Sequence, residues 1–113
     1  MSSISERPAK KTVLVLLHGA TANGRMWDPV RRILENRGYR VLSPDLPGHG
    51  SRRNEAFTLP AAIETVRRAV ASVAPAPVVV AGDSLGGYVT MASAGALPGT
   101  QLRGIVPSGC TLV

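Results

Sequence analysis

The strongest constraint on the fold is the alternation of short apolar runs with segments of helical periodicity. Residues 12–17 read TVLVLL and residues 78–81 read VVVA, two continuous runs of β-branched and aliphatic residues. Runs of this length and composition are typical of strands that are buried on both faces. Such strands occur in parallel sheets that are covered by helices on both sides. The sequence therefore predicts an α/β fold, a three-layer sandwich with a mostly parallel sheet.

The remaining elements follow the same alternation. Thr58 is a candidate N-cap for a helix whose first turn contains Pro60, and Gly38 is placed to end an earlier helix. The helices are predicted from apolar residues that recur every three or four positions. The predicted strands are 12–17, 39–43, 78–81 and 102–106, and the predicted helices are 27–34, 59–73 and 85–97.

Length and composition point to one soluble domain. The 113 residues suffice for a single domain, and 44% apolar with 18% charged residues predicts a packed core. No apolar run approaches the roughly 18 residues that a membrane span requires. Residues 1–11 lack the apolar segment of a secretion signal, so we expect an N-terminal extension before a domain at 12–113. The single cysteine, Cys110, is expected to be a buried reduced thiol, and a cytoplasmic location is predicted.

The net charge of +6 raises the alternative of nucleic-acid binding. The arginine pairs at 31–32, 52–53 and 67–68 are separated along the chain, and two of them fall on predicted solvent-facing sides of helices. The four aromatic rings, from one Trp, two Tyr and one Phe, form no stacking motif. The sequence therefore predicts a basic surface, with neither a nucleic-acid nor a membrane partner.

A serine stands between the third predicted strand and the third predicted helix, in the stretch GDSLG at 82–86. In a G-x-S-x-G turn the flanking Gly82 and Gly86 remove side chains that would collide, and the turn exposes the serine hydroxyl. The amide of Leu85 would then point at a developing oxyanion. The alternative is a glycine-rich turn in which Ser84 only caps the following helix.

Two other loops also follow predicted strands. His18 and Gly19 come directly after the first strand, and residues 45–51, DLPGHGS, come after the second. In parallel sheets the loops that carry chemistry collect at the carboxyl ends of the strands. We therefore expect these two loops and the Ser84 turn to meet at one edge of the sheet.

These three motifs, LHGA at 17–20, DLPGHGS at 45–51 and GDSLGG at 82–87, together resemble the N-terminal half of the α/β-hydrolase fold family. The resemblance implies a truncated α/β-hydrolase fold with about four strands. It further implies that Ser84 is the nucleophile and that the backbone amides of Ala20 and Leu85 form an oxyanion hole. The residues that would support this site are His18, Gly19, Gly82, Asp83 and Gly86, with Asp83 lining the turn without being the triad acid.

The activating partners of the serine are missing from this pattern. In the family the catalytic triad runs in the order serine, acid, histidine, yet no Asp, Glu or His follows Ser84. The resemblance likens His18 to a support of the oxyanion loop and His49 to a structural loop residue. An unconventional role of either as the base is the alternative, and Asp45 is expected to anchor its loop.

The sequence thus predicts a serine hydrolase for a small acyl substrate (an ester, thioester or amide) that is incomplete as given and inactive or very weak alone. The alternative is a non-catalytic relative, or half of an assembly completed by another chain. Neither the substrate nor the triad acid and base can be assigned from these residues. The predicted edge strand 102–106, with Ile105 and Val106 facing outward, and the apolar tail 111–113 favour self-association or a complementing C-terminal half.

No cofactor or metal is predicted. Residues 19–24 have the G-x-x-x-x-G frame of a phosphate loop but lack its Lys and Ser/Thr, and no dinucleotide-binding G-x-G-x-x-G follows a strand. One cysteine and two distant histidines give no metal-ligand spacing.

Overall fold

A computed structural model describes residues 11–110 of the chain. Most of the predicted N-terminal extension and the apolar tail at 111–113 lie outside the described residues. The described strands form one four-stranded sheet in the order β2-β1-β3-β4, and every pairing is parallel. The predicted α/β class is confirmed. The strands are β1 (Val13–Leu17), β2 (Arg40–Leu42), β3 (Val78–Asp83) and β4 (Leu102–Ser108).

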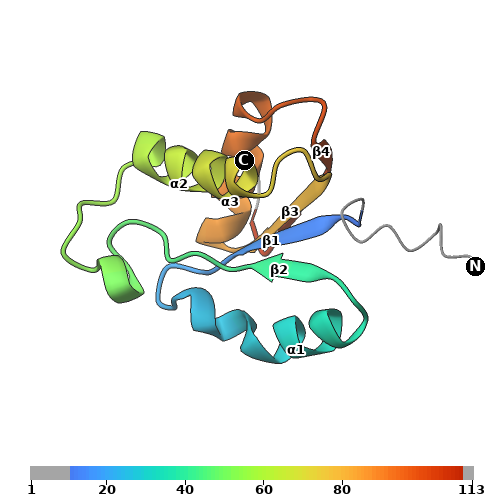
Figure 1. The fold of residues 1–113 in the computed structure, drawn as a ribbon. Coiled ribbons are helices and arrows are strands. Elements are labelled where there is room, and N and C mark those ends of the chain that lie inside the picture. The colour runs from blue at the N-terminus through green and yellow to red at the C-terminus, as the bar shows by residue number, and fades with distance from the viewer. Residues whose placement is uncertain (1–10, 111–113) are drawn as a thin grey trace, which may run out of the picture.

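Helices cover both faces of this sheet, which gives the three predicted layers. One helix, α1, lies on one side of the sheet, and α2 and α3 lie on the other (Figure 1). The helices are α1 (Asp28–Asn36), α2 (Leu59–Ser72) and α3 (Leu85–Ser93), with short 3-10 turns η3 (Gly24–Trp27), η4 (Gly50–Arg52) and η5 (Ala94–Ala96).

The predicted helix signals are confirmed at the atomic level. The hydroxyl oxygen of Thr58 accepts a hydrogen bond from the amide of Ala61 at 3.2 Å, so Thr58 caps α2. Gly38, just beyond α1, has a φ of +90°, a conformation that costs glycine nothing. The third helix is shorter than predicted, because α3 ends at Ser93 and the chain tightens into η5 before Pro98.

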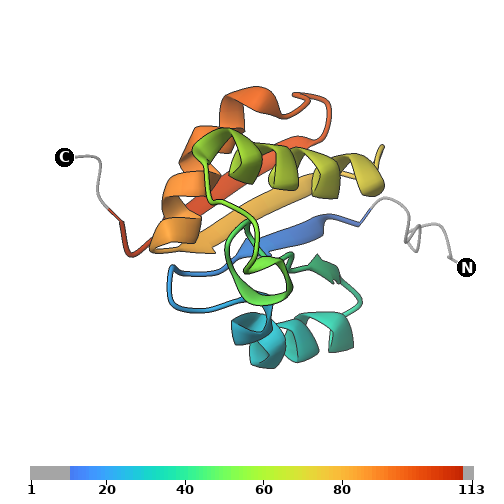
Figure 2. The same ribbon diagram turned by 90° about the vertical axis from the view of Figure 1, so that its left-hand side faces the viewer.

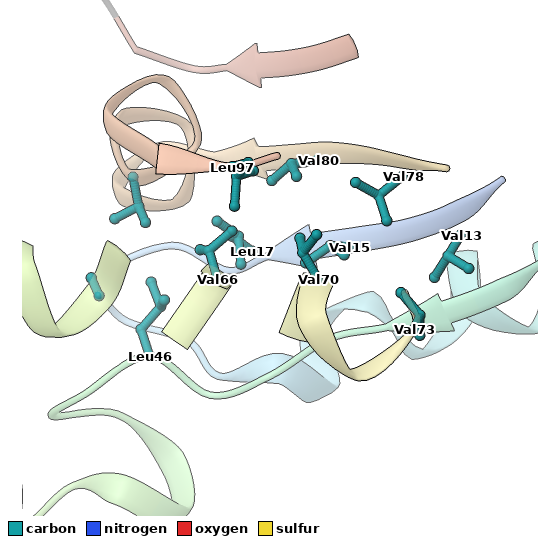
Figure 3. Close-up of a cluster of buried hydrophobic side chains, with 12 residues drawn as sticks. Val13, Val15, Leu17, Leu46, Val66, Val70, Val73, Val78, Val80 and Leu97 are labelled. Atoms are coloured by element: carbon teal, nitrogen blue, oxygen red, sulfur yellow. The ribbon is translucent and has the colours of Figure 1, made fainter. Parts of the chain in front are cut away.

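The core lies between the sheet and the α2–α3 layer (Figure 3). Alternate residues of β3, Val78 and Val80, point into it and are fully buried, whereas Val79 and Ala81 on the opposite face are half-buried. Each fully buried valine or leucine contributes about 1.5–3 kcal/mol. The core residues are Val13, Val15, Leu17, Leu46, Ala62, Val66, Val70, Val73, Val78, Val80, Val89 and Leu97.

Two expectations about exposure are wrong. Ile105 does not face outward with Val106, because successive strand residues point to opposite faces: Ile105 packs against the core, whereas Val106 is 54% exposed. Cys110 is half-buried rather than buried, since it lies just past the end of β4. Among the described residues β4 pairs only with β3, so it is an edge strand as predicted.

Candidate active site

The loop after β1 and the start of α3 lie at the same end of the sheet (Figure 2). A Cβ atom placed on Gly19 would be 3.7 Å from the Cβ of Ser84, so these loops are in van der Waals contact. The loop at 45–51 joins them, because the amide of Leu46 donates a hydrogen bond to the ring of His18 at 2.9 Å. The three motifs therefore meet at the carboxyl ends of the strands.

Ser84 has an unusual backbone conformation. Its φ of 57° and ψ of −114° make it the single non-glycine residue with a positive φ in the described part of the chain. Such a conformation costs of order 1–3 kcal/mol and persists only where neighbours hold it. The Ser84 amide donates to the carbonyl of Ser108 at 2.8 Å, and the Ser84 carbonyl accepts from the amide of Gly87 at 2.9 Å. The turn is thus fixed to both β4 and α3.

The glycines beside Ser84 allow the backbone to pack closely. A Cβ on Gly86 would lie 2.7 Å from the carbonyl oxygen of His18, and a Cβ on Gly82 would lie 2.7 Å from the hydroxyl oxygen of Thr90. Real Cβ atoms are essentially never this close to other heavy atoms. Any other residue at position 86 would push α3 away from the end of β1, and with it Ser84 away from Gly19.

Three polar groups at this edge have no partner among the described residues. Leu85 is the first residue of α3, so its amide has no acceptor within the helix. The amide of Ala20 also donates no hydrogen bond to a described residue. The Ser84 side chain is exposed and does not cap α3, so the interpretation of Ser84 as a simple capping residue receives no support.

His18 is fully buried and holds backbone groups with both ring nitrogens. Because Nε2 accepts the hydrogen bond from Leu46, the proton sits on Nδ1, which donates to the carbonyl of Gly19 at 2.8 Å. Burial lowers the pKa of His18; the nearby His49 acts in the same direction, and the hydrogen bond to Gly19 and the charge of Asp45 oppose it. A neutral His18 with both nitrogens engaged offers no lone pair to Ser84.

His49 also uses both of its ring nitrogens on the backbone. Nε2 lies 2.7 Å from the carbonyl oxygen of Ala20, and Nδ1 lies 3.0 Å from the carbonyl oxygen of Pro47. Within the described residues neither histidine forms a hydrogen bond with Ser84. The geometry therefore gives no support to either histidine as the base.

Asp45 anchors its loop, as the sequence predicted. Oδ1 accepts from the amide of Gly24 at 2.7 Å, and Oδ2 accepts from the amide and the hydroxyl of Ser51 at 2.9 and 2.7 Å. Burial raises the pKa of Asp45, but these three hydrogen bonds outweigh it and the net pKa is lowered. The carboxylate thus ties the far end of the loop at residues 18–24 to the loop at 45–51.

The contacts of Arg52 were not apparent from the sequence. Arg52 donates to the carbonyl of Asp45 at 3.2 Å and to the hydroxyl of Thr65 at 2.7 Å, which fastens the 45–51 loop to α2. No motif marks this arginine.

Asp83, which the resemblance places along the turn, is half-buried beside the end of β4. Its Oδ1 lies 2.8 Å from the position that a Cβ atom on Gly109 would take.

Neither a metal centre nor a membrane span is found in residues 11–110. No group of three His, Cys, Asp or Glu side chains there is arranged to hold a metal ion. No described helix combines the length and the apolar character needed to cross a bilayer.

Comparison with known proteins finds relatives that match much of this chain. The magnesium-chelatase 30 kDa subunit of Rhodobacter capsulatus is 36% identical over 105 residues, which cover 90% of this chain and 37% of that protein. The pimeloyl-[acyl-carrier protein] methyl ester esterase of Pseudoalteromonas atlantica is 40% identical over 75 residues, covering 66% and 28%. The matched residues therefore span only 28–37% of the length of these relatives.

A solved structure and a family model extend the agreement to the fold. The structure of an extracellular alpha/beta-hydrolase from a Paenibacillus species superposes with a TM-score of 0.74 at 25% identity, covering 84% of this chain and 39% of that one. The model of the alpha/beta hydrolase family matches residues 14–113. Since that match includes all three motifs and nearly all of the described structure, the chain belongs to the alpha/beta hydrolase family.

Proposed function

We propose that this chain is the nucleophile-bearing part of a serine hydrolase that cleaves the acyl bond of a small ester, thioester or amide. The observation that carries the proposal is the backbone of Ser84, held at a positive φ at the start of α3 beside two amides that have no acceptor among the described residues. An ester-cleaving enzyme among the relatives, the methyl ester esterase, supports the substrate class.

In this proposal the Ser84 hydroxyl oxygen attacks the acyl carbon, and the electron pair of the carbonyl bond moves onto its oxygen. The amides of Ala20 and Leu85 donate to that oxyanion, assisted by the positive end of α3. The hydroxyl proton has to pass to a base during the attack. Both histidines are engaged with backbone groups, and no Asp, Glu or His follows Ser84 in the sequence. We therefore propose that the base and its acid come from outside these 113 residues.

The same missing base favours a second candidate function. A relative that keeps the turn around Ser84 but lacks an activating partner could serve as a non-catalytic binding protein or as half of an assembly. The two proposals differ in one property, the reactivity of the Ser84 hydroxyl towards an electrophile.

Ion pairs on the helices and the single cysteine support the proposed partners and location. Arg31 pairs with Glu35 at 3.1 Å, and Glu64 pairs with both Arg67 and Arg68, so two carboxylates partly offset these three cations. This supports a small-molecule partner over nucleic acid. The one free thiol, Cys110, is in keeping with a cytoplasmic location.

A fluorophosphonate probe tests the proposal. We expect slow formation of one adduct per chain on Ser84, because a site without its base keeps roughly 10³–10⁴-fold acceleration over water from oxyanion and binding effects. Intact-mass and peptide mass spectrometry locate the adduct. Ser84→Ala should abolish it, and Ser72→Ala, on the exposed side of α2, should not. Scattered adducts on several serines would contradict the assignment, and a folded chain with no adduct would favour the non-catalytic candidate.

A further inference from the structure

We propose that Arg52 is a positioning residue for the Ala20 amide, which it orients through a line of hydrogen bonds that passes through His18. Every donor in this line points the same way, from the guanidinium of Arg52 towards the Ala20 N–H. The contribution of this line to catalysis rests on the function proposed above, in which that N–H meets an oxyanion.

The line begins at the peptide between Asp45 and Leu46. Its carbonyl oxygen, that of Asp45, accepts a hydrogen bond from Nη1 of Arg52 at 3.2 Å. Its N–H, that of Leu46, donates to Nε2 of His18 at 2.9 Å. The C=O and N–H of a trans peptide lie in one plane and point in opposite directions. Arg52 and His18 therefore hold one rigid plane from its two sides.

His18 carries the line to a second peptide. Because Nε2 accepts from Leu46, the ring proton lies on Nδ1, which donates to the carbonyl of Gly19 at 2.8 Å. This carbonyl shares a planar peptide with the Ala20 N–H, which therefore points away from the ring. Leu46, His18 and Gly19 are buried, where the hydrogen bonds of a chain strengthen one another. The direction of the Ala20 amide thus depends on both peptide planes.

The first of these planes has no further hydrogen bond in the described part of the chain. Arg52 is the one described residue that donates to the Asp45 carbonyl, and His18 is the one that accepts from the Leu46 amide. The plane also lies beyond the end of β2 at Leu42, so no strand pairing restrains it. Without the Arg52 side chain the plane would be held on one side alone and would tilt, which weakens the hydrogen bond from Leu46 to His18.

The Arg52 side chain is itself held in the orientation that this role requires. Nε and Nη2 donate to the two carboxylate oxygens of Glu55 at 3.0 and 2.7 Å. Nη1 donates to the carbonyl of Asp45 and to the hydroxyl of Thr65, the latter at 2.7 Å. A guanidinium presents its donors in a rigid planar fork, so the pairing of one edge with Glu55 fixes the direction of Nη1.

Arg52→Met tests the proposal, because methionine fills much of the same space but donates no hydrogen bond. The backbone of residue 52 should stay in place, since its amide donates to the His49 carbonyl at 2.9 Å and its carbonyl accepts from the Gly48 amide at 3.0 Å. Arg53→Met is the matched control and removes the same charge. Arg53 is exposed, and its side chain forms no hydrogen bond with a described residue.

NMR of the ¹⁵N-labelled chain measures the hydrogen bond from Leu46 to His18 as the scalar coupling between the Leu46 amide nitrogen and Nε2. In Arg52→Met we expect this coupling to fall and the Leu46 amide to exchange about 2–30-fold faster, the range for substitutions within a coupled network. Arg53→Met should match the parent chain. The buried Val78 amide, which donates to the Gln101 carbonyl, should exchange at the parent rate in both variants and shows that the fold is intact.

Two more variants separate positioning from simple fastening of the loop to α2. Thr65→Val removes the acceptor on α2 but leaves the Asp45 carbonyl to Arg52, so the coupling should stay near its parent strength. Arg52→Gln ends two bonds short of Nη1 and should lower the coupling, which decides the question if Arg52→Met does not fold. An unchanged coupling in the folded Arg52 variants, or an equal loss in Thr65→Val, would overturn the proposal.

The rate at which the fluorophosphonate labels Ser84 tests the consequence for the Ala20 amide. We expect labelling to slow about 2–30-fold in Arg52→Met and to stay unchanged in Arg53→Met. A lowered coupling with no change in labelling rate would overturn the link between Arg52 and the Ala20 amide. A parent chain that is not labelled at all would contradict the proposed function, and the coupling alone would then decide whether Arg52 positions His18.

Discussion

Replacing Gly86 by alanine should separate α3 from β1 and destabilise the fold. The new Cβ would lie 2.6 Å from the carbonyl carbon of Leu17 and 2.7 Å from the carbonyl oxygen of His18, whereas comfortable carbon contacts are about 3.5–4.0 Å. Both neighbours are backbone atoms, so no side-chain rotation can relieve the overlap. β1 is also paired on both sides, to β2 and to β3, so it cannot move alone.

The magnitude follows from two opposing effects. Overpacking a well-packed site costs about 1–3 kcal/mol, and we expect about 3 kcal/mol because the atoms in contact belong to a paired strand. Replacing glycine by alanine within a helix returns about 0.4–1 kcal/mol. The net loss of unfolding free energy is therefore about 2 kcal/mol, which for a domain of this size lowers Tm by roughly 8–16 °C.

Gly95→Ala is the matched control for this substitution. Gly95 lies in η5, and a Cβ there would meet no heavy atom within 4 Å. Urea and thermal unfolding followed by far-ultraviolet circular dichroism compare the two variants with the parent chain. We expect Gly95→Ala to be neutral or slightly stabilising. If Gly86→Ala unfolded at the same urea concentration and temperature as Gly95→Ala, the reasoning about close approach at the serine turn would be refuted.

Three further predictions concern the loop at residues 18–24, its buried histidine and the sheet edge. Ala20→Pro removes the amide donor and should slow labelling of Ser84 by about 10²–10³-fold, whereas Ala20→Ser keeps it; equal labelling rates would rule out the donor. The pKa of His18 is lowered, so its neutral form is favoured by folding, and the Leu46 amide should lose exchange protection as pH falls below about 6.5. Protection of Leu46 that stays constant down to pH 4 would contradict this. Val106→Lys places a charge on the exposed edge strand and should reduce self-association, measured by size-exclusion chromatography. An unchanged elution profile would show that β4 is not the surface through which the chains associate.

Most parts of the fold that the sequence predicted are set by local chemistry, whereas the meeting of the three loops at one sheet edge follows from the parallel strand topology. The apolar run at 78–81 predicts β3 because a strand buried on both faces needs apolar residues at every position. The glycines at 82 and 86 predict a sharp turn because side chains there would collide, and the structure shows which atoms they would meet. Thr58 predicts the start of α2 because its hydroxyl satisfies an amide only three residues away.

The parts that the sequence did not predict depend on residues far apart in the chain. Asp45 reaches Gly24 across 21 positions, and His49 reaches Ala20 across 29, so no local pattern contains these contacts. Nor could the sequence separate Ile105 from Val106, two apolar neighbours whose exposure depends on which face of β4 meets the core. The half-buried state of Cys110 likewise depends on how the segment after β4 lies against the start of α3.

The most direct test of the proposed site is a crystal structure of the chain with a phosphonate bound covalently to Ser84. The phosphoryl oxygen of that adduct takes the place of the oxyanion that forms during acyl transfer. We predict that this oxygen lies within about 2.7–3.1 Å of the amide nitrogens of both Ala20 and Leu85. An adduct on Ser84 whose phosphoryl oxygen contacts neither amide would contradict the assignment of the oxyanion hole, and with it the proposed chemistry.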